Sequence, residues 1–220
     1  MNSDDLNKRK LFENDDLLVI DKPYDMPSTG RSLDDSDCLQ YWVIKAQDQM
    51  IWALHQLDAD TTGINIFVKK KKLVAKYKDL LSSSESSKKY LAIVHGQPTW
   101  DEIHEHANLG YIDERSFGIV ENGKSAHSFF KTLQTSERAS LIMAEIFTGR
   151  THQIRLHLSH LGHPLFGEEW YSRPPCKEHP RQTLHAWKVS LGKDDHFLSE
   201  PPQDFLTLSK KLNLDLEKVL

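Results

Sequence analysis

His55-Gln56-Leu57-Asp58-Ala59-Asp60-Thr61-Thr62-Gly63 leads directly into Ile64, Ile66 and Val68, whose alternation along the chain predicts a strand. The nine residues before this strand are mostly polar and end in glycine, so they predict a loop at the mouth of a sheet. A carboxylate on such a loop, here Asp58, can reach a ligand while a rigid strand holds it in place. The alternative interpretation is a loop whose Asp and Thr side chains only satisfy backbone donors.

Outside this loop, the sequence predicts many strands with a few helices between them. Strands are expected at residues 17–20, 90–94, 116–120, 125–133, 141–147 and 184–191, and helices at 39–50, 73–81, 151–161 and 205–212. Asn122-Gly123 predicts a two-residue hairpin between its flanking strands, because this pair tolerates positive φ at both turn positions. Thr151 is the expected N-cap of its helix, and Gly162 the expected stop. Without regular strand–helix alternation, the pattern predicts an α+β fold with a mixed, largely antiparallel sheet and flanking helices.

Composition limits the class of protein. The chain has 220 residues, of which 38% are hydrophobic and 27% charged, as expected for a globular protein near the upper end of one domain. No apolar run approaches the roughly 18–20 residues that a membrane span needs, and the acidic N-terminus is unlike a signal peptide. Cys38 and Cys176 show no paired spacing, which favours structural thiols in a reducing compartment. We therefore expect a cytoplasmic protein without membrane contact.

The formal net charge of −4 is unusual for a nucleic-acid binder, but the charges are unevenly distributed. Residues 1–37 carry ten acids and five bases, and residues 194–220 carry six acids and three bases. Between them, Lys69–Lys89 holds eight lysines against two acids. A basic middle with acidic ends can still present a positive face, although a lysine run on a helix is often only a solvated surface.

A second informative stretch is Thr148-Gly149-Arg150-Thr151-His152-Gln153-Ile154-Arg155-Leu156-His157. Arg150 and Arg155 lie at the start of a predicted helix and one turn into it, where guanidinium groups can pair with a carboxylate or a phosphate. The exposed amides of a helix N-terminus would assist in binding an anion. The alternative is two surface arginines without a ligand.

Together these stretches resemble the RluA-like pseudouridine synthases. The Asp58 loop is similar to that family's signature, His-Arg-Leu-Asp, two variable residues, then Thr-Ser-Gly. The family's second motif is similar to Lys88-Lys89-Tyr90-Leu91-Ala92-Ile93-Val94-His95-Gly96, and its third is similar to Gly149–Arg155 followed by Gly162-His163-Pro164-Leu165. Weaker resemblances flank these motifs at Asp21-Lys22-Pro23 and Leu184-His185-Ala186. The matches occur in the family's order and span about residues 11–206.

The resemblance implies an RNA pseudouridine synthase with a central catalytic cleft, an isomerase that needs no metal and no organic cofactor. Asp58 would be the catalytic carboxylate, kept ionised by Arg155, since a nearby opposite charge lowers a carboxyl pKa. Tyr90 would pack against the flipped uracil, with Gln56 and Arg150 as further substrate-binding residues. The substrate would be a uridine in tRNA or rRNA that leaves its stack to reach the site.

The sequence departs from the family pattern in three places. Gln56 stands where the family usually has an arginine that contacts RNA, and Thr62 replaces the usual serine. The core begins near Leu11, so we expect a flexible N-terminus over residues 1–10 and a single catalytic domain over 11–220, without the S4-type domain of many relatives. We also expect the protein to be a monomer. RNA phosphates would then contact Lys69–Lys78 together with three arginines, Arg150, Arg173 and Arg181.

Two other functions fit parts of the sequence. A catalytically degenerate relative that binds RNA without turnover would agree with Gln56 and with the acidic balance, but not with the presence of Asp58, Tyr90 and Arg155. A metal hydrolase could use the histidines of one predicted helix and its end, because imidazoles at helical spacing can converge on zinc. Those histidines are His152, His157, His160 and His163.

Overall fold

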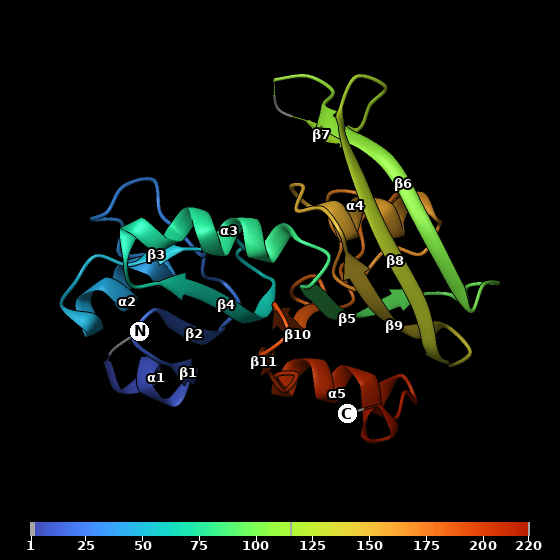
Figure 1. The fold of residues 1–220 in the computed structure, drawn as a ribbon. Coiled ribbons are helices and arrows are strands. Elements are labelled where there is room, and N and C mark those ends of the chain that lie inside the picture. Colours follow the sequence, from blue (N-terminus) through green and yellow to red (C-terminus); the bar gives the residue numbers. More distant parts are fainter. Residues whose placement is uncertain (1–2, 115, 220) are drawn as a thin grey trace. The chain divides into compact units, whose positions relative to one another are not determined.

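The computed structural model describes residues 3–114 and 116–219, which form two compact units (Figure 1). Unit 1 comprises Met1–Ser87 and His185–Pro201, and unit 2 comprises Lys88–Leu184 and Pro202–Leu220. Each unit combines strands with helices, and most strand pairs are antiparallel, which confirms the predicted α+β class. The single catalytic domain expected over residues 11–220 stays a prediction.

Unit 1 contains a mixed sheet with the strand order β1-β2-β4-β10, to which β3 adds beside β4 and β11 beside β10. Strand β4 is antiparallel to β2 and parallel to β10. The elements are α1 (Ser3–Lys8), β1 (Lys10–Glu13), β2 (Leu17–Lys22), α2 (Leu39–Gln47), β3 (Trp52–Ala53), β4 (Thr62–Val68), the 3₁₀ helix η1 (Lys71–Leu73), α3 (Val74–Ser82), β10 (Leu184–Leu191) and β11 (Asp195–Leu198).

Part of the N-terminal segment is helical, and the flexibility expected over residues 1–10 stays a prediction. Ser3–Lys8 forms helix α1, and Leu6 is only 3% exposed because it belongs to the apolar core of unit 1. That core also contains Leu18 and Ile20 of β2, and Leu39 and Val43 of α2. Leu6 thus joins this short polar helix to the core of unit 1.

Every residue of β4 is buried, although the alternation of Ile64, Ile66 and Val68 alone would suit a strand with one solvent-exposed face. Both faces of β4 are therefore covered, and its entrance is equally tight. Gly63 has a φ of +104°, and a Cβ at this position would lie 2.3 Å from the carbonyl oxygen of Ala186 on β10. Only glycine fits between the Asp58 loop and the strand.

Unit 2 contains an antiparallel sheet with the strand order β5-β9-β8-β6-β7. Helix α4 packs on strands β6 and β8 of this sheet (Figure 1). The elements are β5 (Ser87–His95), β6 (Glu102–Tyr111), β7 (Phe117–Ile119), β8 (Lys124–Thr135), β9 (Ala139–Ile146), α4 (Gln153–His160), α5 (Gln203–Lys211) and the 3₁₀ helix η2 (Leu216–Lys218).

The hairpin predicted at Asn122-Gly123 is wrong. The chain turns there, with the Gly123 N–H donating to the Val120 carbonyl at 3.2 Å, but β7 and β8 do not pair with each other. Both pair with β6, which lies between them: Leu109 of β6 is opposite Ile119 on one side and Lys124 on the other. The sequence analysis missed β6, and this strand takes the position that a hairpin partner would occupy.

Helix α4 begins two residues later than predicted, and Thr151 is not its cap. His152 occupies the N-cap position with a left-handed φ of 52°. The side-chain oxygen of Gln153 accepts hydrogen bonds from the Arg150 N–H at 3.0 Å and from the Thr148 hydroxyl at 2.7 Å. A buried amide therefore closes this turn, while Gly162, with a φ of +84°, ends the helix as predicted.

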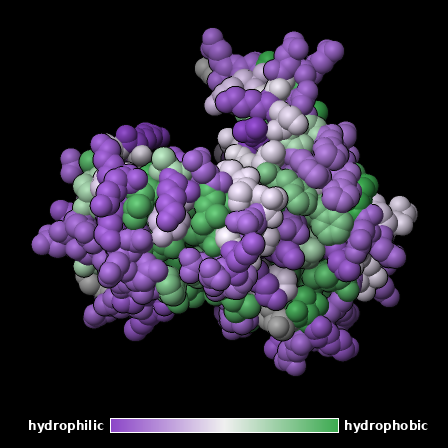
Figure 2. Space-filling view, in the orientation of Figure 1, coloured by the Kyte–Doolittle hydropathy of each residue, from purple (hydrophilic) through white to green (hydrophobic). Residues whose placement is uncertain are grey.

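The described part of the chain contains no helix with the length and apolar character required to cross a bilayer. The face seen in Figure 2 is mostly hydrophilic, with hydrophobic residues in small separate areas.

Candidate functional site

The Asp58 loop connects β3 to β4 and is held at several points. At its start, the Asn65 side chain on β4 donates to the His55 carbonyl at 3.1 Å. In its middle, the Ser28 hydroxyl accepts the Leu57 N–H at 2.9 Å, next to Asp58. After Asp58, the Thr61 N–H donates to the Asp58 carbonyl at 3.1 Å. The backbone around this half-buried carboxylate is thereby fixed, as a catalytic group requires.

Lys22 braces the same loop from inside the unit. Its side chain is fully buried, and its ammonium donates to the carbonyls of Pro23 at 2.8 Å, Met26 at 2.7 Å and Ala59 at 2.8 Å. Ala59 directly follows Asp58, and its carbonyl also accepts the Met26 N–H at 3.1 Å. The Asp21-Lys22-Pro23 stretch is thus tied to the candidate catalytic residue by a charged donor.

We expect Lys22→Met to lower the free energy of unfolding by about 2 kcal/mol, since hydrogen bonds from a charged donor contribute about 1.5–3 kcal/mol. Methionine fills similar space but leaves three buried carbonyls without this donor. Denaturant unfolding of wild type and variant measures the change. The matched control is Lys70→Met, which removes an exposed ion pair with Asp16 and should hardly alter unfolding. Equal effects from both variants would contradict the bracing role of Lys22.

His185 supports the end of the loop. Its Nε2 lies 2.8 Å from the carbonyl of Ser199, which can only accept, so Nε2 carries the hydrogen. The other ring nitrogen, Nδ1, lies within hydrogen-bonding distance, 2.9 Å, of the hydroxyl of buried Thr62. The Leu184-His185-Ala186 stretch therefore positions the Thr-Thr-Gly end of the loop, and threonine at position 62 keeps the hydroxyl that this contact uses.

Gln56 lies exposed on the same loop, and its Nε2 donates to the Thr29 hydroxyl at 2.9 Å. This contact joins the loop to the segment between β2 and α2. An arginine at this position would carry a positive charge at the surface of unit 1, whereas Gln56 supplies only a neutral amide.

In unit 2, Arg155 of α4 is almost fully buried and is held by a carboxylate that the sequence analysis missed. Its Nε and Nη2 donate to the two oxygens of Glu168 at 2.8 and 2.9 Å, and its guanidinium lies 5.1 Å from the ring centre of Trp170 and 5.2 Å from that of Tyr171. Burial raises the pKa of Glu168, but the hydrogen bonds and charge of Arg155 and the N–H groups of Trp170 and Tyr171 outweigh it and leave this pKa lowered. Arg155 is thus a fixed cation with its own counter-ion.

Tyr90 and Arg150 also belong to unit 2. Tyr90 is 6% exposed and lies opposite Ala144 in the β5–β9 ladder, while exposed Arg150 donates from Nε to the Ser125 carbonyl at 2.9 Å. Asp58 and Gln56 belong to unit 1. The predicted approach of Arg155 and Tyr90 to Asp58 therefore stays a prediction.

Unit 2 has an open groove of about 540 Å³ beside the Arg155 site. Its lining includes Phe117 from β7, Leu156 from α4, and Trp170 and Tyr171 from the following segment. His152 also lines it, and its Nδ1 lies 2.6 Å from the Tyr171 hydroxyl. Aromatic rings on an open groove are suited to stacking with unpaired bases.

The structure corrects part of the predicted phosphate-binding surface. Arg181 is 2% exposed and its Nε donates to Asp204 at 2.6 Å, so it serves as a structural ion pair and not as a surface cation. In unit 1, Lys69 pairs with Glu13 at 2.5 Å, and with Lys10 it lowers the Glu13 pKa to about 2. Five other lysines of that stretch are exposed, of which one, Lys70, pairs with Asp16; they are Lys70, Lys71, Lys72, Lys76 and Lys78.

The histidines considered for a hydrolytic metal each have a different neighbour. His152 contacts the Tyr171 hydroxyl, His157 the Ser128 hydroxyl, His160 the Glu105 carboxylate and His163 the His95 carbonyl. Among the described residues, the side chains that gather closely enough for a metal are different ones. One group is His104, His106 and His127; the other is His95, Cys176 and Glu178.

Comparison with known proteins places these features in a family context. Residues 16–160 match the family described as RNA pseudouridylate synthase. The ribosomal large subunit pseudouridine synthase D of Nitrosomonas europaea is 33% identical over 196 residues, and that of Pseudomonas aeruginosa is 30% identical over 239 residues. The chain spans 57% of the length of the first relative and 74% of the second, while 82% and 97% of the chain are covered.

Solved structures show the same fold. The human RNA pseudouridylate synthase domain containing 4 superposes with a TM-score of 0.82 at 21% identity, covering 97% of this chain and 96% of that one. The human RNA pseudouridylate synthase domain containing 1 gives a TM-score of 0.75 at 22% identity, covering 96% and 91%. At these identities the likeness concerns the fold alone.

Proposed function

Because the chain belongs to the RNA pseudouridylate synthase family, we propose that it isomerises a specific uridine of structured RNA to pseudouridine. The observation that carries this proposal is the family match, which includes both the braced Asp58 loop and the start of α4 with Arg155. The names of the relatives favour ribosomal RNA over tRNA as the substrate. The reaction has no net redox change or hydrolysis, so it calls for no cofactor.

We assign Asp58 as the catalytic carboxylate. The bond between uracil and ribose must break, the uracil must turn, and C5 must then join the ribose carbon that N1 has left. An ionised carboxylate beside this electron-poor carbon can form a bond to it or remove a neighbouring proton. The fixed backbone around Asp58 supports this role, because catalysis depends on a carboxylate that is already positioned before the substrate arrives.

Arg155 and Tyr90 are proposed to act on the same nucleotide. Arg155 would favour the ionised form of Asp58, since a nearby opposite charge lowers the pKa of a carboxyl group. The Tyr90 ring would pack against the flipped uracil, whose unstacking costs a few kcal/mol that other contacts must offset. Gln56 and Arg150 would contact RNA near this nucleotide.

The test of the function is the formation of pseudouridine by the purified chain. RNA from cells that lack the gene is incubated with the protein, labelled chemically at pseudouridine and sequenced, beside RNA from cells that have the gene. The proposal expects the same position to be labelled in both samples and to stay unlabelled without enzyme. Tight RNA binding with no labelled position would instead support the relative that binds RNA without turnover.

We expect Gln56→Arg to tighten RNA binding and to steepen its salt dependence, with little change in the chemical step. Each added phosphate contact on a single strand makes the slope of log affinity against log salt more negative by about 0.7. Binding isotherms across a salt series measure both slopes. The control is Arg31→Gln, which changes charge on a neighbouring loop. Equal slopes for wild type and Gln56→Arg would show that position 56 does not contact the RNA.

We also propose that the protein acts as a monomer in the cytoplasm. Both cysteines, Cys38 and Cys176, are buried thiols, which suits a reducing compartment where RNA is processed. Light scattering coupled to size-exclusion chromatography tests the oligomeric state, and fractionation of cells that express the chain tests its location.

A further inference from the structure

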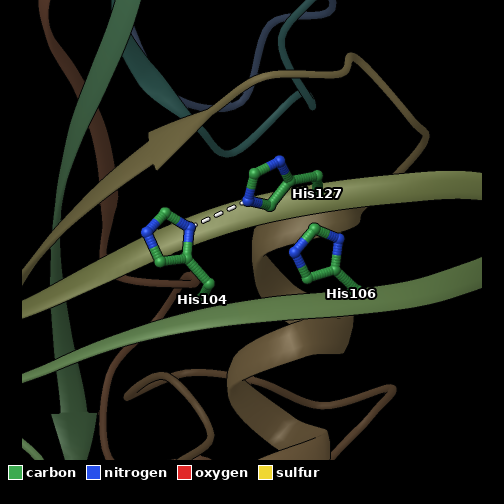
Figure 3. A group of neighbouring side chains, drawn as sticks. All are labelled: His104, His106 and His127. Carbon is green, nitrogen blue, oxygen red and sulfur yellow. Dashed lines mark hydrogen bonds between the residues drawn. The ribbon is translucent and has the colours of Figure 1, made fainter.

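Three histidines lie on one face of the unit 2 sheet, on two neighbouring strands (Figure 3). His104 and His106 are two residues apart on β6, so their side chains point to the same face. His127 of β8 lies directly opposite His106 in the antiparallel ladder and therefore shares that face as well. Glu105, between the first two, points to the other face, where it contacts His160 of α4.

The three imidazoles already touch. His104 Nδ1 lies 2.9 Å from His127 Nε2, and the rings of His106 and His127 stack with their centres 3.9 Å apart. One ring nitrogen of each histidine lies within 4.8 Å of the others. The group sits on the outer face of the sheet: His104 and His106 are exposed and His127 is half-buried.

We propose that His104, His106 and His127 form a binding site for a late first-row divalent metal ion, with Zn²⁺ as the expected ligand. Neutral imidazole suits zinc, copper and nickel, and three imidazoles with an open fourth position are an established donor set for Zn²⁺. Zinc–nitrogen bonds of about 2.0–2.1 Å in a tetrahedral site place the nitrogens roughly 3.4 Å apart. The three donor nitrogens lie within 4.8 Å of one another, and the stacked rings of His106 and His127 must rotate for their nitrogens to converge on one ion.

Metal binding would replace the contact between His104 and His127. In that contact one neutral ring donates its N–H to the other, so the donating ring must move its hydrogen to its other nitrogen before both can ligate. This shift keeps each ring neutral and releases no net proton. The fourth position would face solvent and take a water molecule or an anionic oxygen, such as one from a phosphate.

The surroundings limit the freedom of the three side chains. The ring of Phe129 lies 4.9 Å from His104, and the ring of Phe147 stacks on His127 at 4.3 Å. The backbone of His127 is also fixed: its N–H donates to the Thr148 hydroxyl at 3.0 Å, and its carbonyl accepts from Gln153 Nε2 at 2.9 Å. Two strands and a buried amide thus hold the donors close together before a metal arrives.

Zn²⁺ binding by the full chain, purified without a histidine tag and stripped of metal, tests the site. Competition with a chromophoric chelator should give one tightly bound Zn²⁺ per chain, and Co²⁺ should give the visible absorption of a four-coordinate ion. His106→Gln and His127→Gln should each weaken binding at least tenfold, since even residues that only orient metal ligands contribute roughly 10–100-fold. Zn²⁺ should also raise the melting temperature of wild type but not of these variants.

The control is His196→Gln, an exposed histidine of unit 1 that contacts Ser190 and Lys193. It should bind Zn²⁺ as wild type does. Absence of stoichiometric binding, or equal affinity in wild type and in both cluster variants, would overturn the proposal. The substituted side chains are at least partly exposed, so metal-free variants should melt near wild type, and the result does not depend on pseudouridine formation.

Discussion

Asp58→Asn is expected to abolish pseudouridine formation, with a loss of at least about 10⁴-fold in turnover, a size typical of removing an essential catalytic group. Asparagine keeps the shape of the side chain but can neither attack an electron-poor sugar carbon nor take up a proton as a carboxylate does. The fold should persist, because hydrogen bonds of other groups hold the loop. The Ser28 hydroxyl accepts from the Leu57 N–H, and the Lys22 ammonium donates to the Ala59 carbonyl. Its melting temperature should stay within a few degrees of wild type.

The matched control is Asp60→Asn, which removes a carboxylate two positions further along the same loop. Pseudouridine is counted at the modified position under single-turnover conditions for wild type and both variants, with circular dichroism melts alongside. Turnover like wild type by Asp58→Asn would refute the assignment of Asp58. Loss in the Asp60 variant alone would move the catalytic role to Asp60.

The sequence analysis predicted the elements that depend on local patterns and missed those that depend on distant partners. Strand 184–191 and the stop of α4 at Gly162 are confirmed, since apolar runs and glycine act locally. Strand β6 was missed because its residues, from Glu102 to Leu109, are rich in histidine and acids and lack β-branched side chains apart from Ile103. Pairing with β8 along its length makes it a strand, and a local pattern does not reveal such pairing.

The same distinction applies to the candidate site. The motif singles out the Asp58 loop and Arg155, but not the contacts that hold them. Lys22 reaches the loop across 37 residues, and Glu168 meets Arg155 across a turn and an irregular segment. A signal existed at Glu168, an acid directly after Gly167, but only the fold shows that this carboxylate is fully buried against a guanidinium.

Glu168→Gln is expected to lower the free energy of unfolding by about 3–5 kcal/mol, the usual effect of removing one partner of a buried ion pair. Arg155 and Glu168 are 6% and 0% exposed in their side chains, so water cannot replace the lost carboxylate. The guanidinium would remain charged and buried, and the NH2 group of the amide would replace one carboxylate oxygen, so one of the two hydrogen bonds from Arg155 would lose its acceptor. For a chain of this length the melting temperature should fall by roughly 6 to 20 °C.

The pH dependence of stability should change in the same variant. The folded pKa of Glu168 lies below its ordinary value of 4.5, so the folded state favours the ionised form. Its contribution to stability is therefore complete above pH 4.5 and is lost as the pH falls through the lowered folded pKa. The difference in unfolding free energy between wild type and Glu168→Gln should be constant near neutral pH and shrink in acid.

Two further variants separate the buried pair from a general effect of charge. Glu178→Gln removes an exposed ion pair with Arg138 and should leave the melting temperature nearly unchanged. Arg155→Met combined with Glu168→Leu removes both buried charges and should recover much of the stability lost in Glu168→Gln, because no charge is then left without a partner. Denaturant unfolding of all four proteins at pH 7 measures these differences. If the double variant is less stable than Glu168→Gln, the ion pair contributes more to stability than the neutralisation of two buried charges. If Glu168→Gln is as stable as wild type, Arg155 does not need Glu168 for folding.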